Sequence, residues 1–413
     1  MIRSSKHTLK YTNKIKKKNI DTFLIEYRRV LHLLIDYMWT NKVQELNISN
    51  NKLHCPKFLD TKILKLFNTW LTARMKQCIG KQACAMVSAA TTKRRKQLYK
   101  LKKLQRKGKS TKYLQITINK HPLVKPDATK VQAEIDGRFI DTQSANHFDE
   151  FIKVKTIGNQ LTFNLPIKYH EISNYWNEEA KRTTGIRLSN NYLCLIFKKE
   201  NEEIEGTKTV GADQGQNTVL SLSDKQVTTK NKHNHDLNSI QDILARRKKG
   251  SNGFKRAQEH RKNYVNWSIN QLNFKDIKKV NIEKVRKLRK GKRSSRKNSH
   301  WTYTLIYDKL TRLSEVKGFK LKEVPNEFRS QRCSQCGWVR KANRKGKGFI
   351  CNLCGYTEDA DLNAAYNLEL DLYEVPFWVR QQKINRSGFY WLEDGLYDVG
   401  HECIVRGTEK TEV

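Results

Sequence analysis

The chain has 413 residues and carries 81 Lys and Arg against 41 Asp and Glu, which gives a formal charge of +40. This length indicates two or three domains, and so large a positive charge would repel itself in a compact fold unless a polyanion neutralised it. The basic residues are clustered rather than spread, so the composition favours a nucleic-acid-binding protein over one that is merely soluble and basic.

The first half of the chain predicts helices followed by short strands. Apolar residues recur at helical spacing over 20–44 and 63–75. A third helical stretch ends in the segment 91–112, which has eleven Lys and Arg and no acid. Such a run is usually a solvated helix face, but in so basic a protein it favours contact with a phosphate backbone. From 113 to 199, short alternating segments between turn signals, beginning with LQITIN, predict an antiparallel β-domain, most simply a barrel, to which residues 6–11 could add a strand.

The second half has a mixed α/β pattern after an acidic linker at 201–206. The last helix is expected to begin near Leu362. From Glu369 to Val413, nine acids outnumber five bases, and this aromatic tail could either dock on a basic surface or form a poorly ordered terminus. The elements expected between linker and tail are strands at 208–213, 217–223, 278–283 and 319–324, and helical regions over 239–271 and 299–318.

No stretch of the sequence approaches the length of apolar chain that crosses a bilayer, and the first twenty residues hold no apolar run of the kind found in secretory signals. We therefore expect an intracellular protein without a membrane partner. Disulfides are rare in that compartment, so the nine cysteines are expected to be reduced thiols or metal ligands.

Four cysteines have the spacing of a metal site. Cys333 and Cys336 form one CxxC pair, Cys351 and Cys354 form another, and fourteen residues separate the pairs. A glycine follows each pair and permits a tight backbone turn. Four thiolates around one ion leave no position open for water, so we predict a structural Zn²⁺. The loop between the pairs is basic, which indicates a finger that touches phosphate.

Three acids end or begin predicted elements where a carboxylate cannot serve as core filler. Asp213 and Glu283 each end a strand, and Asp361 opens the last helix two residues after Asp359. Acids from separate elements can converge, and converging carboxylates favour Mg²⁺ or Mn²⁺ between them. Each acid alone is weak evidence: Asp359 is best interpreted as an N-cap, and Glu283 by itself could equally end a surface strand.

Taken together, the stretches VGADQGQNTVLSLS, VNIEKV, RSQRCSQCG and DADLNAAYNL resemble the TnpB proteins of insertion sequences and the miniature type V CRISPR effector nucleases. The resemblance covers about 208–370 with specific motifs. It implies a RuvC-like nuclease in which Asp213, Glu283 and Asp361 are the catalytic, Mg²⁺-binding acids. The residues after the first two acids, Gln214 among them, depart from the family's usual ones but leave all three acids in place.

Extended to the whole chain, the resemblance implies a multidomain α+β fold. An RNase H-like (RuvC) α/β nuclease domain would contain an inserted zinc ribbon, and an N-terminal β-barrel, or wedge, domain would contain a helical insertion. The expected domains are the wedge at 1–12 and 113–200, the helical recognition insertion at 13–112, the nuclease at 201–327 and 358–372, the zinc ribbon at 328–357 and the acidic tail at 373–413.

The implied function is that of an RNA-guided DNA endonuclease. Such a protein binds a structured guide RNA, recognises a short motif beside the target, forms an RNA–DNA heteroduplex and cleaves both DNA strands at one two-metal site. We expect guide RNA and target double-stranded DNA as partners, a monomer or homodimer on one RNA, and a place in the prokaryotic cytoplasm, at the nucleoid when bound to DNA. A nuclease-silent guided repressor and an RNA-independent RuvC-type resolvase or transposase stay open as alternatives.

Basic residues near these motifs and in the helices are the expected nucleic-acid contacts. Because base pairing with the guide recognises the target sequence, the protein needs only a basic channel that fits the heteroduplex. The residues expected to line it are Arg94, Arg95, Lys96, Lys102, Lys103, Arg106, Arg246, Arg247, Lys255, Arg256, Arg286, Arg289, Lys290, Arg293, Arg340, Lys341 and Arg344.

Overall fold

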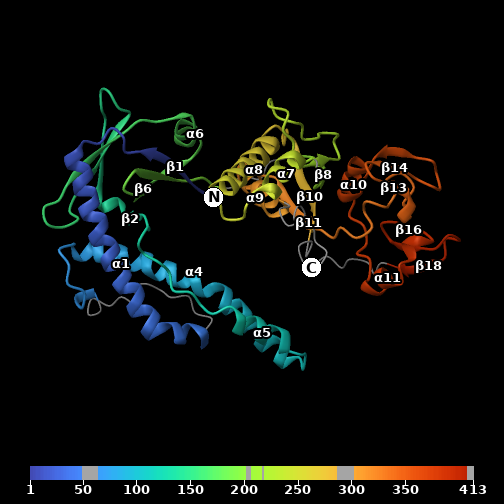
Figure 1. Cartoon of the computed structure of the whole chain (residues 1–413), viewed down its shortest axis with the longest axis horizontal. Coiled ribbons are helices and arrows are strands. Elements are labelled where there is room, and N and C mark those ends of the chain that lie inside the picture. The colour runs from blue at the N-terminus through green and yellow to red at the C-terminus, as the bar shows by residue number, and fades with distance from the viewer. Residues whose placement is uncertain (49–63, 201–205, 216–217, 286–301, 407–413) are drawn as a thin grey trace. The chain divides into compact units, whose positions relative to one another are not determined.

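The computed structural model describes residues 1–48, 64–200, 206–215, 218–285 and 302–406, with only the backbone given for 41–48 and 406 (Figure 1). The chain divides into two compact units, Met1–Glu200 and Asn201–Val413. Among the described helices, none has both the length and the apolar character needed to cross a membrane.

Two long helices of the N-terminal unit, α1 (Lys14–Ile48) and α4 (Ala73–Arg106), pack against each other (Figure 1). The fully buried Tyr27 of α1 joins them, because its hydroxyl donates a hydrogen bond of 2.6 Å to Oε1 of Gln82 on α4. Phe23, one turn earlier on α1, packs its ring against the ring of Phe163, which begins a strand of this unit. The apolar stripe that predicted a helix over 20–44 is therefore the face that joins helices and sheet.

The segment LQITIN, expected as a strand, is instead helical and belongs to α5 (Lys112–Lys120). Only Ile118 of its apolar residues is buried, while Tyr113 and Ile116 are exposed. Arg94 of α4 donates hydrogen bonds to the carbonyl oxygens of Ile118 and His121, at 3.0 and 2.6 Å. Both carbonyl groups lie at the end of α5, where that of Ile118 also accepts from the amide of His121 at 3.4 Å, so a contact distant in sequence adds to the stability of the helix.

The remaining strands of this unit are antiparallel, as predicted, and form two sheets. The N-terminal strand pairs along its whole length with β7, from Ile2 opposite Lys198 to Thr8 opposite Tyr192. Closure into a barrel stays a prediction. The order of the first sheet is β1 (Ile2–Thr8), β7 (Tyr192–Lys198), β6 (Lys181–Leu188) and β2 (Ala133–Ile135). The order of the second is β3 (Ile140–Gln143), β4 (Glu150–Val154) and β5 (Phe163–Ile167). The helix α6 (Glu171–Glu179) follows β5 in the chain.

A mixed four-stranded sheet organises the C-terminal unit, in the order β11-β10-β8-β9. The strands β8, β10 and β11 are parallel, and β9 runs antiparallel to β8. The basic helical region expected over 239–271 is two helices rather than one. The elements are β8 (Lys208–Asp213), β9 (Ser221–Leu222), α7 (Leu237–Arg246), α8 (Asn252–Asn270), β10 (Ile277–Glu283), α9 (Tyr303–Lys317), β11 (Lys320–Val324) and α10 (Ala360–Glu369).

The two faces of this sheet are covered by different helices. Val210 and Val280, which point to one face, share a buried core with side chains of α7, α8 and α9. The alternate residues Gly211 and Asn281 point to the other face, where they contact α10. The sheet is thus enclosed on both sides, as expected for parallel strands.

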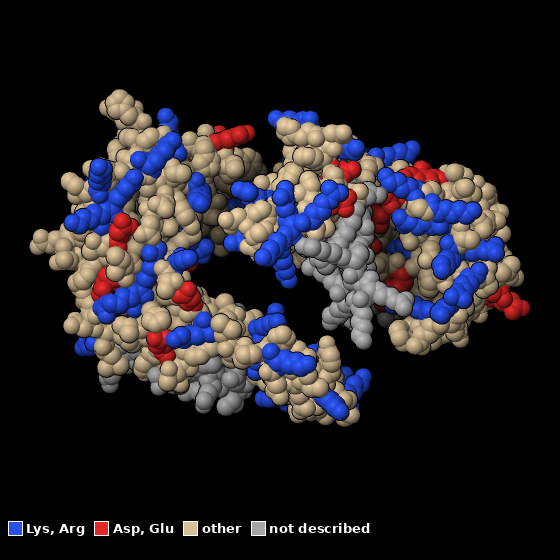
Figure 2. All heavy atoms as spheres, in the orientation of Figure 1, with Lys and Arg blue, Asp and Glu red and all other residues tan. Residues whose placement is uncertain are grey.

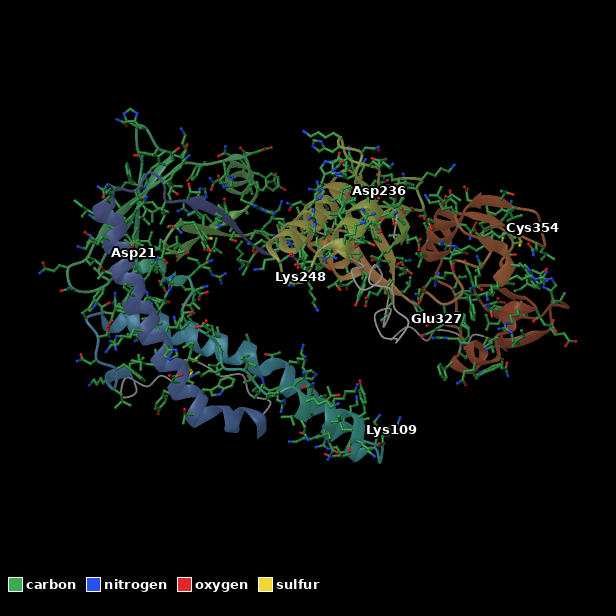
Figure 3. All side chains as sticks on the ribbon, in the orientation of Figure 1. Asp21, Lys109, Asp236, Lys248, Glu327 and Cys354 are labelled. Carbon is green, nitrogen blue, oxygen red and sulfur yellow. The ribbon has the colours of Figure 1, made fainter. Side chains whose placement is uncertain are left out.

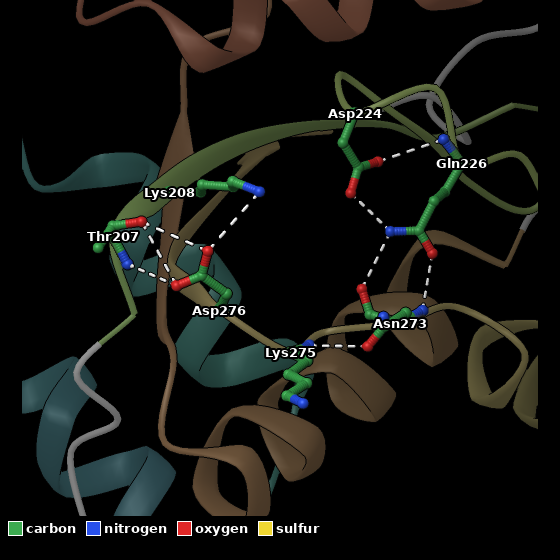
Figure 4. Close-up of polar contacts among 7 residues, drawn as sticks. All are labelled: Thr207, Lys208, Asp224, Gln226, Asn273, Lys275 and Asp276. Carbon is green, nitrogen blue, oxygen red and sulfur yellow. Dashed lines mark hydrogen bonds and ion pairs between the residues drawn. The ribbon is translucent and has the colours of Figure 1, made fainter.

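A polar clamp fixes the end of the sheet where β8 and β10 begin (Figure 4). Asp276 accepts hydrogen bonds from the amide nitrogen and hydroxyl of Thr207, at 3.2 and 3.4 Å, and lies 3.6 Å from the ammonium of Lys208. Nearby, the side-chain amide of Gln226 exchanges hydrogen bonds of 3.0 and 2.7 Å with the backbone of Asn273. These contacts hold the register of β8 against β10, and hence the position of the residues at their far ends.

The C-terminal tail folds against the cysteine-rich segment. Trp338 and Val339 pair with Tyr390 and Phe389 across two strands, and Trp391 is buried beside them. Of the two alternatives left open for the tail, a poorly ordered terminus is therefore wrong for the described residues up to 406. The elements are β12 (Trp338–Val339), β13 (Arg344–Lys345), β14 (Gly348–Ile350), β15 (Thr357–Asp359), α11 (Phe377–Gln382), β16 (Phe389–Trp391), β17 (Gly395–Tyr397) and β18 (Cys403–Arg406).

Candidate active site and zinc centre

Two of the predicted acids lie side by side at the carboxyl ends of neighbouring strands. Ala212 of β8 is paired in register with Ile282 of β10. The next residues along the two parallel strands are Asp213 and Glu283. Parallel pairing therefore brings together two carboxylates that are seventy residues apart in the sequence.

The third acid reaches this edge because α10 packs tightly on the sheet. A Cβ atom added at Gly211 would overlap the carbonyl oxygen of Ala365, so only glycine permits this approach. Asn281 of β10 donates hydrogen bonds of 3.0 and 3.1 Å to the carbonyl oxygens of Leu368 and Glu369, at the end of the helix. Asp361, one turn before Ala365, lies toward the ends of the strands.

Asp213, Glu283 and Asp361 line one pocket of about 480 Å³. Arg344, from the hairpin between the cysteine pairs, donates a hydrogen bond of 3.0 Å from its guanidinium to Oδ1 of Asp361. The side chain of Asp361 is 18% exposed and that of Arg344 is 32% exposed, so this ion pair is partly shielded from water. The other residues around the pocket are Gln214, Gly215, Asn326, Arg329, Ser330, Gly346, Lys347, Ala364 and Leu368.

The electrostatics of the pocket favour the protonated forms of two of its acids when no cation is bound. Burial raises the pKa of Glu283 to about 7, above its ordinary value of 4.5. Burial also raises the pKa of Asp213 well above its ordinary value, and the negative charges of Glu283 and Asp361 raise it further. The guanidinium of Arg344 lowers both pKa values. Bound cations would offset the unfavourable negative charge of the ionised carboxylates, so the pocket favours cation binding.

The donor set fits hard divalent cations. Three carboxylates around one pocket supply the oxygen ligands that Mg²⁺ and Mn²⁺ prefer. Among the described residues, only the four cysteines place three or more candidate ligand atoms all within 4.8 Å of one another.

The four predicted cysteines form one cluster. Sγ of Cys333 lies 3.7 Å from Sγ of Cys354, and Sγ of Cys336 lies 3.7 Å from Sγ of Cys351. A tetrahedral site with Zn–S distances of about 2.3 Å places its sulfurs about 3.8 Å apart. The cluster, which includes the exposed Cys354 labelled in Figure 3, therefore has the dimensions of a Cys₄ zinc site.

Both cysteine pairs adopt the same turn. The amide of Gly337 donates 3.0 Å to the carbonyl of Cys333, and the amide of Gly355 donates 3.0 Å to that of Cys351. The φ angles of these glycines are +79° and +74°, a region that side chains with a Cβ rarely enter. The glycines therefore allow each turn to present its two sulfurs to one ion, as the sequence predicted.

A buried polar network joins the zinc ribbon to α10. Arg332 donates from Nη1 to Oδ1 of Asn367 at 2.6 Å and from Nε to the carbonyl of Trp391 at 2.8 Å. Asn367 and Asn363, one turn apart on the helix, donate to the carbonyl of Arg332 at 2.7 and 2.9 Å. Both asparagines are fully buried. The network fixes the zinc ribbon, the tail and the helix that carries Asp361 as one body.

The basic residues predicted to bind nucleic acid fall into four groups. Arg94 and Arg95 are bonded within the N-terminal unit, Arg94 to the end of α5 and Arg95 to its own helix, and Arg344 is paired with Asp361. Arg340 is half-buried. Exposed residues are Lys96, Lys102, Lys103, Arg106, Arg246, Arg247, Lys255, Arg256 and Lys341, and Figure 2 shows such side chains over the α4–α5 arm. Arg286, Arg289, Lys290 and Arg293 lie outside the described residues.

Sequence reasoning missed three features of the site. Arg344 was assigned to nucleic acid, whereas its described partner is Asp361. Gln214, noted only as a departure from the family, is buried and donates from Nε2 to the backbone carbonyl of Glu283 at 3.2 Å. The role of Asn363 and Asn367 could have been found from their spacing of four residues, which places them on one helix face. The N-cap role of Asp359 is confirmed, since its Oδ1 accepts from the amide of Asp361 at 2.9 Å.

Comparison with known proteins locates the strongest similarity in this same region. Residues 303–368 match the family model described as Cas12f1-like, TNB domain. A CRISPR-associated endodeoxyribonuclease Cas12f1 of Sulfoacidibacillus thermotolerans is 39% identical over 77 residues, 18% of each chain. A TnpB-like protein of Aquifex aeolicus is 34% identical over 95 residues, which are 21% of this chain and 31% of that protein. The alignments thus span less than a third of either relative.

Similarity of fold extends further than similarity of sequence. A chain in a cryo-EM structure of a Cas12f1–sgRNA–target DNA complex superposes with a TM-score of 0.51 and 14% identity, over 87% of this chain and 83% of that one. At this identity the match shows the fold alone. Together with the segment matches, it confirms the resemblance to TnpB proteins and miniature type V CRISPR effectors that the motifs predicted.

Proposed function

We propose that this chain is an RNA-guided DNA endonuclease that hydrolyses phosphodiester bonds at the pocket of Asp213, Glu283 and Asp361. The observation that carries the proposal is the meeting of these three acids, from two strand ends and one helix start, at a single pocket beside a Cys₄ ribbon. The β8–β10–β11 sheet with α10 on one face is consistent with a RuvC-like nuclease domain, which we assign to this part of the C-terminal unit.

Mg²⁺ or Mn²⁺, when bound, would supply a nucleophilic water and stabilise the departing oxygen of a phosphodiester. Asp213, Glu283 and Asp361 would hold the ions, and the raised pKa values of Asp213 and Glu283 mean that these two would lose protons as they did so. Gln214 and the tight packing of α10 on Gly211 keep the carboxylates in place.

We propose that Arg344 exchanges partners during the reaction. Its guanidinium is paired with Asp361, and it lies on the hairpin that borders the pocket. Arginine binds phosphate through two parallel hydrogen bonds and keeps its charge at any working pH. With Asp361 engaged in holding a cation, Arg344 would be available for the scissile phosphate and would stabilise the charge that develops there.

The structural role proposed for the Cys₄ site is to replace a hydrophobic core in a small, basic segment. Zn²⁺ binding contributes folding free energy to segments that cannot bury enough apolar surface. Here the ribbon would hold the hairpin of Arg344 over the pocket, while the Arg332–Asn367 contact transmits its position to α10.

Guide RNA and target double-stranded DNA are the partners we propose, because the matched fold is that of a protein solved with sgRNA and target DNA. The formal charge of +40 provides the phosphate-binding capacity that such a complex requires. The domain boundaries given above, cleavage of both strands, a monomer or homodimer on one RNA, and a cytoplasmic, nucleoid-associated location are parts of the same proposal.

The test is purification of the full chain after co-expression with the DNA that flanks its gene, followed by high-salt washing and sequencing of any bound RNA. The proposal expects one structured transcript and Mg²⁺-dependent cleavage of a plasmid that carries the matching target. Protein without RNA that still cleaves would favour the resolvase or transposase. RNA-guided binding without cleavage would favour the repressor.

A further inference from the structure

A second pocket, whose lining includes none of the three acids, lies between α8 and the loop before α7. Its volume is about 370 Å³, within the range of about 300–1,000 Å³ that small-ligand sites occupy. Four rings surround it: the imidazoles of two histidines and the larger rings of one tyrosine and one tryptophan. The lining residues are Asn231, Lys232, His233, His260, Asn263, Tyr264 and Trp267.

The loop side of this pocket is built by one asparagine. Oδ1 of Asn231 accepts hydrogen bonds from the amides of both His233 and His235, each at 3.0 Å. The backbone of Asn231 also exchanges bonds with Asn234 and His235, at 2.8 and 3.0 Å. The loop ends at Asp236, labelled in Figure 3, which caps α7. These hydrogen bonds within the loop fix the turn and hold His233 at the rim of the pocket.

The helix side is fixed independently. Tyr264 is buried, and its hydroxyl donates 2.9 Å to the carbonyl of Thr229, which ties α8 to the start of the loop. Trp267, one turn later, packs against the Tyr264 ring at a centroid distance of 5.9 Å yet remains 37% exposed. An anchored tyrosine thus supports a tryptophan that offers free ring surface to the pocket.

The imidazoles do not form a metal site in this arrangement. The rings of His235 and His260 meet edge to face at 5.1 Å, and among the described residues only the four cysteines form a cluster with metal-ligand spacing. Burial and the neighbouring histidines lower the pKa of His260, so its ring is largely neutral at pH 7. A neutral imidazole beside an exposed indole is a stacking surface rather than a charged one.

We propose that this pocket binds an unpaired nucleobase of the bound nucleic acid. Unstacked bases bind to proteins by stacking on Trp, Tyr and His rings and by hydrogen bonds to side-chain amides, and the amides of Asn231 and Asn263 lie at the same pocket. Lys232 at the rim and the exposed Arg256, one turn before His260 on α8, supply cations for the flanking phosphates.

The inference deepens the proposed function, on which it rests for nucleic acid as the partner. It assigns to α8 a site that binds a nucleobase, in addition to any attraction between the basic residues of α8 and phosphates. The base could come from a loop of the guide RNA or from a displaced strand of the target DNA, and the chemistry of recognition is the same in both.

The experiment compares base-bearing and abasic single strands of about ten nucleotides, in RNA and in DNA, for binding to the full chain by fluorescence anisotropy at fixed salt. Loss of stacking on one base costs about 5- to 150-fold in affinity. Trp267→Ala should lower affinity for base-bearing strands by a factor in this range and leave affinity for abasic strands unchanged. Trp267→Phe should restore most of the loss. Trp378→Ala, which removes another exposed tryptophan from α11, should change neither.

A Trp267→Ala protein that keeps its full preference for base-bearing strands would overturn the inference, as would an equal loss on abasic strands. A preference for the RNA series would assign the site to the guide, and one for the DNA series to the target strand. Guided plasmid cleavage by the unaltered protein is measured in parallel. If the protein cleaves but its preference for bases does not depend on Trp267, the base-binding inference is wrong and the proposed nuclease stands. If the preference depends on Trp267 but the protein does not cleave, the proposed nuclease is wrong and the base-binding inference stands.

Discussion

The guanidinium of Arg344 lies 3.0 Å from the carboxylate of Asp361, although the two residues come from opposite sides of the second cysteine pair. The hairpin of β13 and β14 delivers the arginine, and the first turn of α10 delivers the aspartate. This ion pair connects the zinc ribbon to the proposed nuclease centre, in addition to the buried contacts of Arg332 with Asn363 and Asn367.

Replacing Arg344 with alanine should lower guided cleavage by roughly 100-fold, the effect of removing one donor that stabilises transition-state charge. Because Arg344 lowers the pKa values of Asp213 and Glu283, its loss should also move the acidic limb of the pH–rate profile to higher pH. Lys345→Ala, an exposed neighbour on the same strand, is the matched control. Unchanged cleavage with an unchanged pH profile would show that the ion pair has no part in the reaction.

The raised pKa of Glu283 predicts that the magnesium-free protein loses stability as pH rises. The folded state holds the proton up to about pH 7, whereas the unfolded state releases it near 4.5, so the free energy of unfolding falls between these values and stays low above them. Glu283→Gln removes this loss. At pH 8 its Tm should exceed that of the unaltered protein by a few degrees, at roughly 2–4 °C for each kcal/mol. At pH 5 the two should differ less.

Thermal unfolding in magnesium-free buffer without chelator measures this effect while leaving zinc in place. Glu323→Gln, an exposed acid on β11 of the same sheet, is the control and should not change the pH dependence. Added Mg²⁺ should raise the Tm of the unaltered protein and leave that of Glu283→Gln nearly constant. Equal pH dependence in both proteins would contradict the assignment of Glu283 to a buried, charge-repelling site.

Cys351→Ser should remove the bound zinc and abolish cleavage while leaving most guide-RNA binding intact. The reason is that Cys351 lies in the cluster that holds the Arg344 hairpin, whereas the N-terminal unit has its own core. Metal analysis should give one zinc per chain before the change and none after it. Cys403→Ser, at an exposed cysteine of the tail, is the control. Equal loss of RNA binding and cleavage would indicate global unfolding instead.

Asn367→Ala should destabilise the C-terminal unit without touching substrate. The change removes one acceptor of the buried Arg332 guanidinium, which keeps the carbonyls of Trp391 and Cys333, and one of two donors to the Arg332 carbonyl. Leaving a buried donor without its partner costs about 1–3 kcal/mol, which corresponds to a fall in Tm of roughly 2–12 °C. Asn352→Ala, at an exposed position of the ribbon, should have little effect. A stable Asn367→Ala protein would mean that water replaces the lost contacts.

The sequence allows prediction of those parts of the site that depend on local pattern. Asp213 and Glu283 end apolar strands, and the carboxyl ends of parallel strands share one edge, so their convergence follows once both strands are assigned. The cysteine pairs fix their own geometry through the turns at Gly337 and Gly355.

Features that depend on contacts between distant segments could not be predicted. The pairing of Arg344 with Asp361 needs the path of the whole hairpin, and the helical state of α5 depends on Arg94, which is distant in sequence. The order of the tail depends on pairing of Phe389 with Val339. In each case the hydrogen bond that stabilises the observed structure joins residues too far apart in the sequence for a local pattern to include both.

The central claim is that Asp213, Glu283 and Asp361 form one metal-dependent centre that cuts DNA under RNA guidance. The most direct measurement is guided plasmid cleavage in Mg²⁺ by the RNA-loaded protein and by its Asp213→Asn, Glu283→Gln and Asp361→Asn variants, with target binding measured alongside. The account predicts that each single variant loses cleavage to background and still binds the target. Cleavage by any one of the three at an undiminished rate would contradict it.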